Sequence, residues 1–123
     1  MQASRADHSV SPPLVDIPRD YNAAHDLLER NAGRPEKTAF INAATGEQLR
    51  FGEVTEQAHR FANALRGLGF APETRILLAM LDTPQWPVAF LGCILAGVVP
   101  VAANTLLTTQ DFDFMLRDSR AQG

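Results

Sequence analysis

The chain of 123 residues carries eleven basic and fourteen acidic side chains, which gives a formal net charge of −3. Apolar residues make up 46% and charged residues 20% of the chain, a globular composition that excludes wholesale disorder. Nucleic-acid binding has no electrostatic support without a basic excess, and the single cysteine excludes an internal disulfide or a multi-cysteine metal site.

Residues 1–20 are expected to form a flexible N-terminal tail. They contain several prolines and show no hydrophobic periodicity, although an extended segment is expected near residues 14–17. Charged residues are scattered through this stretch and no apolar run follows a basic start, so it does not resemble a signal peptide. Together with the single cysteine, this leads us to expect a cytoplasmic protein.

The segment after the tail is predicted to form a helix and then a β-hairpin. Asn22 can cap the helix, which ends at a glycine and a proline a few residues later. Strands are expected over residues 37–41 and 48–51, joined by a turn in which Gly46 supplies a positive φ.

The clearest helical pattern follows the hairpin. Its apolar residues recur at helical spacing and form one stripe: Val54, Ala58, Phe61, Ala62 and Leu65. Glu53 at the start and two arginines in the later turns suit the helix dipole, and Gly67 ends the helix.

The second half of the chain is predicted to contain a βαβ unit. A nearly continuous apolar run over residues 75–81 indicates a strand covered on both faces. Thr83 can cap a helix over residues 84–96 that is apolar all round and therefore central, and a second strand follows over residues 98–102. Strands connected in this way are expected to be parallel.

The uncharged stretch over residues 86–103 is long enough to require a membrane test. Two prolines and a glycine interrupt it, and its valines favour a strand, so we interpret it as a buried helix followed by a buried strand. Within that helix we expect Phe90 and Ile94 to be buried between layers, with Gly92 allowing close approach of a neighbour.

A last helix, capped by Thr108 or Thr109, is predicted near the end of the chain. Its apolar stripe consists of three residues: Phe112, Met115 and Leu116. The acidic residues in its first turn are explained by helix capping and the dipole rather than by catalysis. An α/β sheet would normally continue with another strand after this helix.

No complete catalytic or metal-binding motif is present, so we expect neither catalytic residues nor a metal site. Phosphate loops of the G-x-x-x-x-G-K-[ST] and G-x-G-x-x-G types are absent, and the only lysine, Lys37, stands at the start of a strand. The histidines have no metal-ligand spacing, and Cys93 lies within an apolar helix as an inert, buried side chain. Asp82 and the pair Asn104 and Thr105 follow the two strands of the βαβ unit, where α/β sheets place ligands.

Four segments resemble the N-terminal part of the benzoate-CoA ligases: RFANALRGLG at 60–69, LDTPQWPVAFLG at 81–92, AGVVPVAANTLLT at 96–108 and MLRDSRAQ at 115–122. These enzymes are aryl-CoA synthetases of the adenylate-forming, AMP-binding superfamily. The resemblance begins near Tyr21 and implies that residues 21–123 are a truncated N-terminal part of such a domain. The implied fold is α/β: an N-terminal β-hairpin plus a βαβ unit, an incomplete piece of the layered N-terminal domain.

The resemblance also implies a parent reaction. A benzoate-type acid attacks the α-phosphate of ATP to give an acyl-adenylate and pyrophosphate, and coenzyme A then displaces AMP. Enzymes of this kind use Mg²⁺ to neutralise the phosphates. Their phosphate loop, aryl-acid pocket and catalytic lysine come after the region covered here, so this chain alone is expected to be inactive and to hold no cofactor.

Two positions depart from the family pattern. Many relatives have Thr or Ser as a helix N-cap where this chain has Arg50, and loss of that oxygen costs about 1 kcal/mol. Many also read Asn-Pro-Arg where this chain reads Asn104-Thr105-Leu106, and in some the Arg helps to hold the coenzyme A nucleotide. The missing basic side chain puts that contact in doubt, and Asn104 and Thr105 are cofactor-binding candidates by position alone.

Two alternatives stay open. The chain could belong to another adenylate-forming enzyme, either a carrier-loading adenylation domain or another acyl-CoA synthetase, or it could be a non-enzymatic interaction module. The expected partners are the remainder of the parent enzyme and a second copy of this chain, because a sheet cut after its last helix leaves apolar surface and strand edges uncovered. Nucleic acid and membranes are not expected partners.

Overall fold

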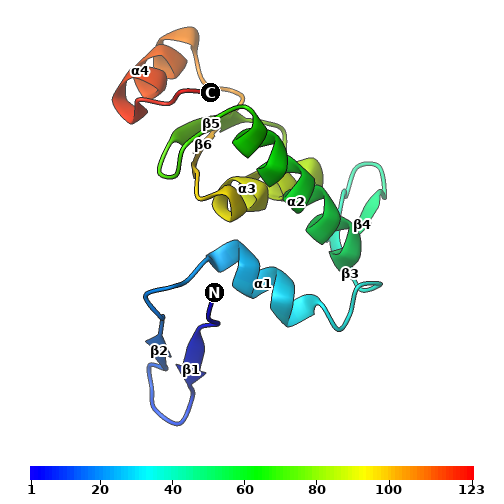
Figure 1. The fold of residues 1–123 in the computed structure, drawn as a ribbon. Coiled ribbons are helices and arrows are strands. Elements are labelled where there is room, and N and C mark those ends of the chain that lie inside the picture. Colours follow the sequence, from blue (N-terminus) through cyan, green and yellow to red (C-terminus); the bar gives the residue numbers. More distant parts are fainter.

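The computed structural model describes all 123 residues as an α/β fold with four helices and three two-stranded sheets (Figure 1). In chain order the elements are β1 (Arg5–Asp7), β2 (Leu14–Asp16), α1 (Ala23–Asn31), β3 (Thr38–Ile41), β4 (Gln48–Arg50), α2 (Phe51–Gly67), β5 (Arg75–Ala79), α3 (Gln85–Ala96), β6 (Val99–Ala103) and α4 (Thr109–Ser119). The predicted fold class, with a β-hairpin ahead of a βαβ unit, is confirmed.

The first 20 residues contain an antiparallel pair of strands. The extended segment expected near residues 14–17 is strand β2, and it pairs with β1, which the sequence pattern did not reveal. Every residue of both strands is exposed. The pair therefore lacks the apolar alternation by which a half-buried strand is recognised in a sequence.

Asn22 fixes the start of α1 in two ways. Its side-chain oxygen accepts a hydrogen bond from the backbone N–H of His25 at 3.0 Å, which confirms the predicted N-cap. Its amide nitrogen donates to the carbonyl oxygen of Ile94 at 2.6 Å, which ties α1 to α3. The hairpin that follows is also as predicted, with β3 and β4 antiparallel and Gly46 at a φ of 75°.

Helix α2 begins at a cap without an acceptor side chain. Arg50 occupies the N-cap position, and its guanidinium pairs with Glu36. The Glu53 carboxylate nevertheless accepts a hydrogen bond from the backbone N–H of Arg50 at 2.8 Å. The carboxylate half of a capping box is thus kept although the hydroxyl half is absent.

The core forms where α2 crosses α3, and Gly92 is the point of closest approach. A Cβ atom at Gly92 would lie 2.8 Å from Cδ1 of Phe61 and 2.9 Å from the carbonyl oxygen of Ala58. The predicted role of Gly92 is confirmed. Several residues of the two helices are fully buried, among them Val54, Ala58, Ala62 and Cys93.

The surroundings of α3 differ from the prediction in two details. Phe90 and Ile94 are half-buried at the margin of the core rather than enclosed between layers, and Phe90 stacks on Trp86 with ring centroids 5.0 Å apart. Thr83 makes no side-chain cap, because the N-cap position of α3 is occupied by Pro84. A helix that is apolar all round carries no periodicity to show which face is innermost.

The stretch over residues 86–103 divides between α3 and β6, as predicted. None of the helices combines the length and the apolar character that crossing a membrane requires. Strands β5 and β6 are parallel, with Arg75 opposite Val99 and Ala79 opposite Ala103, which confirms the predicted βαβ unit.

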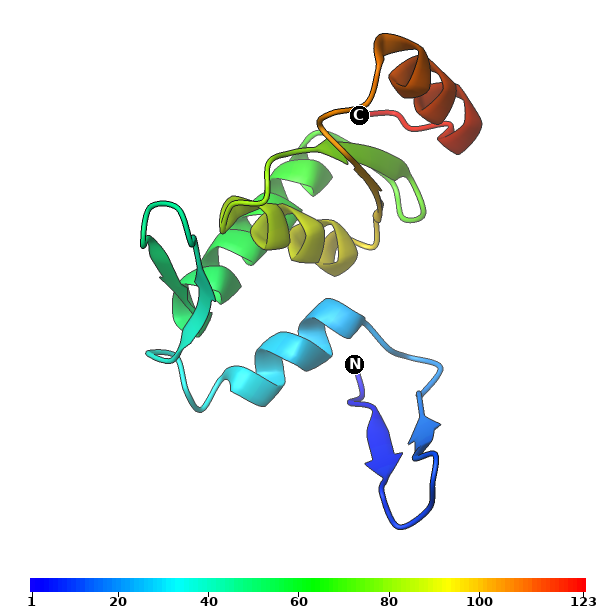
Figure 2. The same ribbon diagram turned by 180° about the vertical axis from the view of Figure 1, so that it is seen from behind.

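Helices cover the β5–β6 pair unevenly. Figures 1 and 2 show α2 and α3 on one side of the pair and α4 on the other. Ile76 and Leu78 are buried, whereas Leu77 is half-buried, Ala79 is exposed and Val99 is 45% exposed. The expectation that the strand over residues 75–81, now β5, is buried on both faces is therefore wrong.

Helix α4 has Thr108 as its N-cap, with reciprocal hydrogen bonds to Asp111, and none of its residues is buried. The expected stripe is accordingly open, with Phe112 and Met115 half-buried and Leu116 exposed. After α4 the chain returns to the edge of β5 opposite β6. There Gln122 N–H donates to the carbonyl of Arg75 at 2.9 Å, and Leu77 N–H donates to that of Gly123 at 2.8 Å.

The crossing of α2 and α3 predicts a strong response to a single methyl group. Gly92→Ala should lower the free energy of unfolding by about 1–3 kcal/mol, because the new Cβ overlaps Phe61 and the backbone of Ala58. Gly67→Ala is the matched control, since nothing lies within 4 Å of a Cβ there. Urea unfolding of both variants tests this, and equal midpoints for Gly92→Ala and the unchanged chain would contradict it.

Candidate functional site

A surface hollow of about 500 Å³ lies at the carboxyl ends of β5 and β6. Its lining comes from the turns that follow the two strands and from the first turn of α3: Met80, Leu81, Asp82, Trp86, Ala102, Ala103, Asn104, Thr105 and Leu106. Carboxyl ends of parallel strands are where α/β sheets bind ligands, because the chain turns there leave a crevice. This hollow is the candidate site of the chain.

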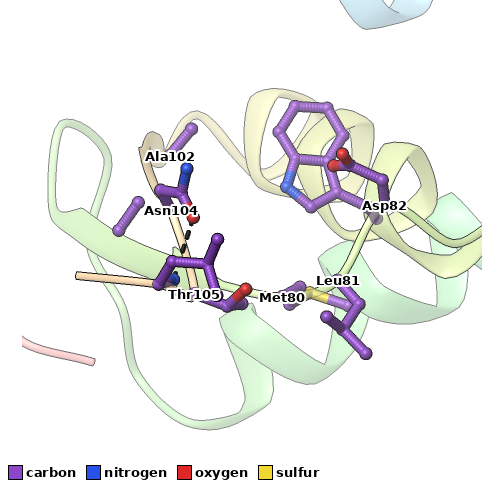
Figure 3. A pocket seen from close by; sticks show the side chains of 9 residues that line it. Met80, Leu81, Asp82, Ala102, Asn104 and Thr105 are labelled. Carbon is purple, nitrogen blue, oxygen red and sulfur yellow. Dashed lines mark hydrogen bonds between the residues drawn. The ribbon is translucent and has the colours of Figure 1, made fainter.

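The structure brings together the residues that the sequence singled out at the strand ends. Figure 3 shows Asn104 and Thr105 on the β6 side of the hollow, and Leu81 and Asp82 on the β5 side. The side-chain oxygen of Asn104 accepts a hydrogen bond from Leu106 N–H at 2.9 Å, which shapes the turn. That bond leaves the amide nitrogen of Asn104 and the hydroxyl of Thr105 as polar groups for a ligand.

The chemistry of the hollow is that of a binding surface. Asp82 is exposed and forms no ion pair, and the remaining lining is apolar or neutral and polar. No nucleophile stands beside a base, and no basic side chain lines the hollow. The arrangement therefore suits a neutral ligand with apolar and amide groups better than a phosphate.

Trp86 is the aromatic residue of the site, and sequence reasoning did not single it out. It lines this hollow and also a second one of about 270 Å³, and the two hollows share Trp86 and Asp82. Its place one turn after Asp82, at the start of a helix that follows a strand, is the signal that could have found it. Stacking on Phe90, with 16° between the ring planes, fixes the orientation of the indole.

The histidines lie apart from this site. His25 and His59 line one hollow of about 210 Å³ with Glu29, although sequence spacing gave no reason to connect them. The structure contains no group of three or more His, Cys, Asp or Glu side chains that could hold a metal ion. Lys37 is exposed directly before β3, where the sequence placed it.

Cys93 is fully buried in the middle of α3, as predicted. Burial raises the pKa of its thiol to about 11, because the thiolate would lose its hydration. The pKa of this thiol is raised in the folded state, whereas that of the unfolded thiol is about 8.5. The contribution of Cys93 to the free energy of unfolding is therefore fully present below pH ~8.5 and is lost as the pH rises toward 11.

We therefore expect Cys93 of the folded chain to react with a thiol reagent at pH 8 at least ~100-fold more slowly than in the unfolded chain. The rate of colour release from an aromatic disulfide reagent, with and without denaturant, measures this. Equal rates in the two states would show that the thiol is accessible.

Comparison with known proteins identifies the class. The profile of the family described as AMP-binding enzyme matches residues 27–123, from within α1 to the end of the chain. The match takes in the βαβ unit and the candidate hollow. The chain belongs to the AMP-binding enzyme family.

Within that family the similarity is high to ligases named for benzoate. The chain is 47% identical to the benzoate–CoA ligase of Thauera aromatica over 122 residues, covering 97% of this chain and 23% of that protein. It is 42% identical over 85% of its length to the 4-hydroxybenzoate–CoA/benzoate–CoA ligase of Rhodopseudomonas palustris, of which it covers 19%. The first alignment extends into residues 1–20, beyond the start near Tyr21 that the resemblance suggested.

A solved structure of similar fold supports the same relationship. A benzoate CoA ligase from Burkholderia xenovorans LB400 superposes with a TM-score of 0.78 at 53% sequence identity, covering 83% of this chain and 20% of that one. The chain thus spans about a fifth of the length of these relatives.

Proposed function

We propose that this chain is the N-terminal part of an AMP-forming aryl-CoA ligase whose substrate is a benzoate-type acid. The parent reaction joins the acid to coenzyme A through an acyl-adenylate, with ATP consumed and AMP and pyrophosphate released. The observation that carries this is the 47% identity to the benzoate–CoA ligase of Thauera aromatica across 97% of the chain. The solved benzoate CoA ligase, at 53% identity, supports the same substrate class.

The cofactors of the parent reaction are ATP, Mg²⁺ and coenzyme A. The hollow at the ends of β5 and β6 does not fit the phosphates of either nucleotide, because none of its side chains is positively charged. Its neutral polar groups fit the amide-bearing arm of coenzyme A instead. We therefore propose Asn104 and Thr105 as contacts for that arm, and we assign no part in adenylation to the hollow.

The chain alone is expected to catalyse no benzoate-dependent exchange between ATP and pyrophosphate. It has no phosphate loop, and its one lysine lies before β3 rather than at the hollow. The measurement is incorporation of labelled pyrophosphate into ATP, in preparations free of host ligase and with a full-length benzoate–CoA ligase as the positive control. Exchange well above the blank without protein would contradict this expectation.

The chain has two partners in this proposal, the remainder of the parent enzyme and, in isolation, a second copy of itself. The free edge of β6 is poorly suited to pairing. Val99 N–H donates to the carbonyl oxygen of Thr74 at 2.8 Å, toward β5. Backbone groups of successive residues in a strand point to opposite sides, so the backbone nitrogen of Pro100 faces the free edge, and proline has no N–H to donate there. The open apolar stripe of α4 is better suited, because Phe112 and Met115 are only half-buried and Leu116 is 45% exposed.

Sedimentation at several concentrations should accordingly detect dimers or larger species at high micromolar concentration. Leu116→Glu should shift the chain toward monomer, because the charge disrupts the apolar stripe of α4. Leu68→Glu is the matched control, since Leu68 is 74% exposed at the far end of α2. A single monomeric species with cooperative unfolding would contradict self-association and would favour an independently folded interaction module.

A further inference from the structure

The carboxylate of Asp26 accepts hydrogen bonds from three residues that are separated in the sequence: Ser4, Tyr21 and Arg30. Asp26 lies in the first turn of α1, is only 4% exposed, and accepts hydrogen bonds from the backbone N–H of Ser4 at 3.2 Å and the Ser4 hydroxyl at 2.6 Å. It also accepts from the Tyr21 hydroxyl at 3.2 Å and from the Arg30 guanidinium at 2.7 Å. Arg30 in turn donates to the carbonyl oxygen of Ser4.

Residues 1–20 are held to the rest of the chain through this cluster. Both strands of their hairpin are fully exposed, and the hairpin packs closely on no other helix or strand. Their other polar contacts are internal, such as the bond from Gln2 N–H to the carbonyl of Asp20 at 3.0 Å. Figures 1 and 2 show the hairpin projecting from the start of α1, away from the sheets and from α2 and α3.

We propose that residues 1–20 form a strap that can be released from the rest of the chain. The hydrogen bonds from Ser4 to the Asp26 carboxylate hold the strap in its closed position. A three-residue, two-stranded hairpin is marginal in water, so contacts outside the hairpin decide whether it stays ordered. Hydrogen bonds to a buried carboxylate are among the strongest single polar contacts available to a chain. These bonds hold the pKa of Asp26 well below its usual range, which keeps the carboxylate ionised at neutral pH.

The strap can open without unfolding the remainder, because none of residues 1–20 is buried. Opening removes the Ser4 bonds and leaves Asp26 with Tyr21 and Arg30, which lie on or next to α1 itself. The cost of opening is thus local, and the open state is a sub-global one of the kind that limited proteolysis detects. The hydrogen bonds between Ser4 and Asp26 thus decide whether residues 1–20 are ordered, and the α/β core stays folded in both states.

Trypsin provides the test on the full chain, because Arg5 lies in β1 and is exposed while Arg66 lies in α2. Cleavage after Arg5 requires the strap to open, so its rate follows the population of the open state. Ser4→Ala should raise that rate about tenfold, since it removes one bond to a charged group, and Asp26→Asn should raise it further. Cleavage after Arg66 should be unchanged in both variants.

Glu56→Gln is the matched control, because it breaks an exposed ion pair of the same i,i+4 spacing, with Arg60 at 3.1 Å, far from the strap. It should leave cleavage after Arg5 unchanged. A Ser4→Ala rate equal to that of the unchanged chain would overturn the proposal. So would cleavage of the unchanged chain as fast as that of a synthetic peptide of residues 1–20. If Asp26→Asn accelerates cleavage at Arg5 and Arg66 alike, Ser4→Ala alone decides.

Discussion

The close contact between α2 and α3 is the constraint on which the rest of this structure depends. Because Gly92 has no side chain, Phe61 and the backbone of Ala58 rest directly on the backbone of α3. At that distance the small residues of both helices are excluded from water, and Cys93 becomes fully buried. The strands that precede and follow α3 in the chain pair with each other, and the start of α1 is bonded to Ile94 of α3, so these elements are all attached to this crossing.

Where the sequence carried a local signal, such as a helical stripe, a capping residue or a turn glycine, it predicted the corresponding element correctly. The stripe from Val54 to Leu65, the cap at Asn22 and the turn at Gly46 all follow from local rules, and each is found. Strand β1 and its pairing with β2 escaped notice because all residues of both strands are exposed, which leaves no pattern to detect. Phe90 and Ile94 were assigned to the interior because an entirely apolar helix gives no sign of which face is innermost.

The candidate site was predictable to the extent that topology governs it. Asp82, Asn104 and Thr105 were expected together because each follows a parallel strand of one sheet, and they line one hollow. Trp86 was missed because its role depends on the orientation that stacking on Phe90 imposes, a tertiary effect. The shared hollow of His25 and His59 was invisible for a similar reason, since it depends on how α1 lies against α2.

The return of the chain to the edge of β5 has a consequence for how the sheet responds to local fluctuations. Thr74 bonds to Val99 on the β6 side, whereas Arg75 and Leu77 bond to residues 122–123 on the other side. Successive backbone groups of β5 thus alternate between two independent neighbours. If residues 122–123 detached from this edge, the hydrogen bonds between β5 and β6 would remain, and β5 would keep its place. The strand beside the candidate hollow is therefore held from two sides, by two segments that do not depend on each other.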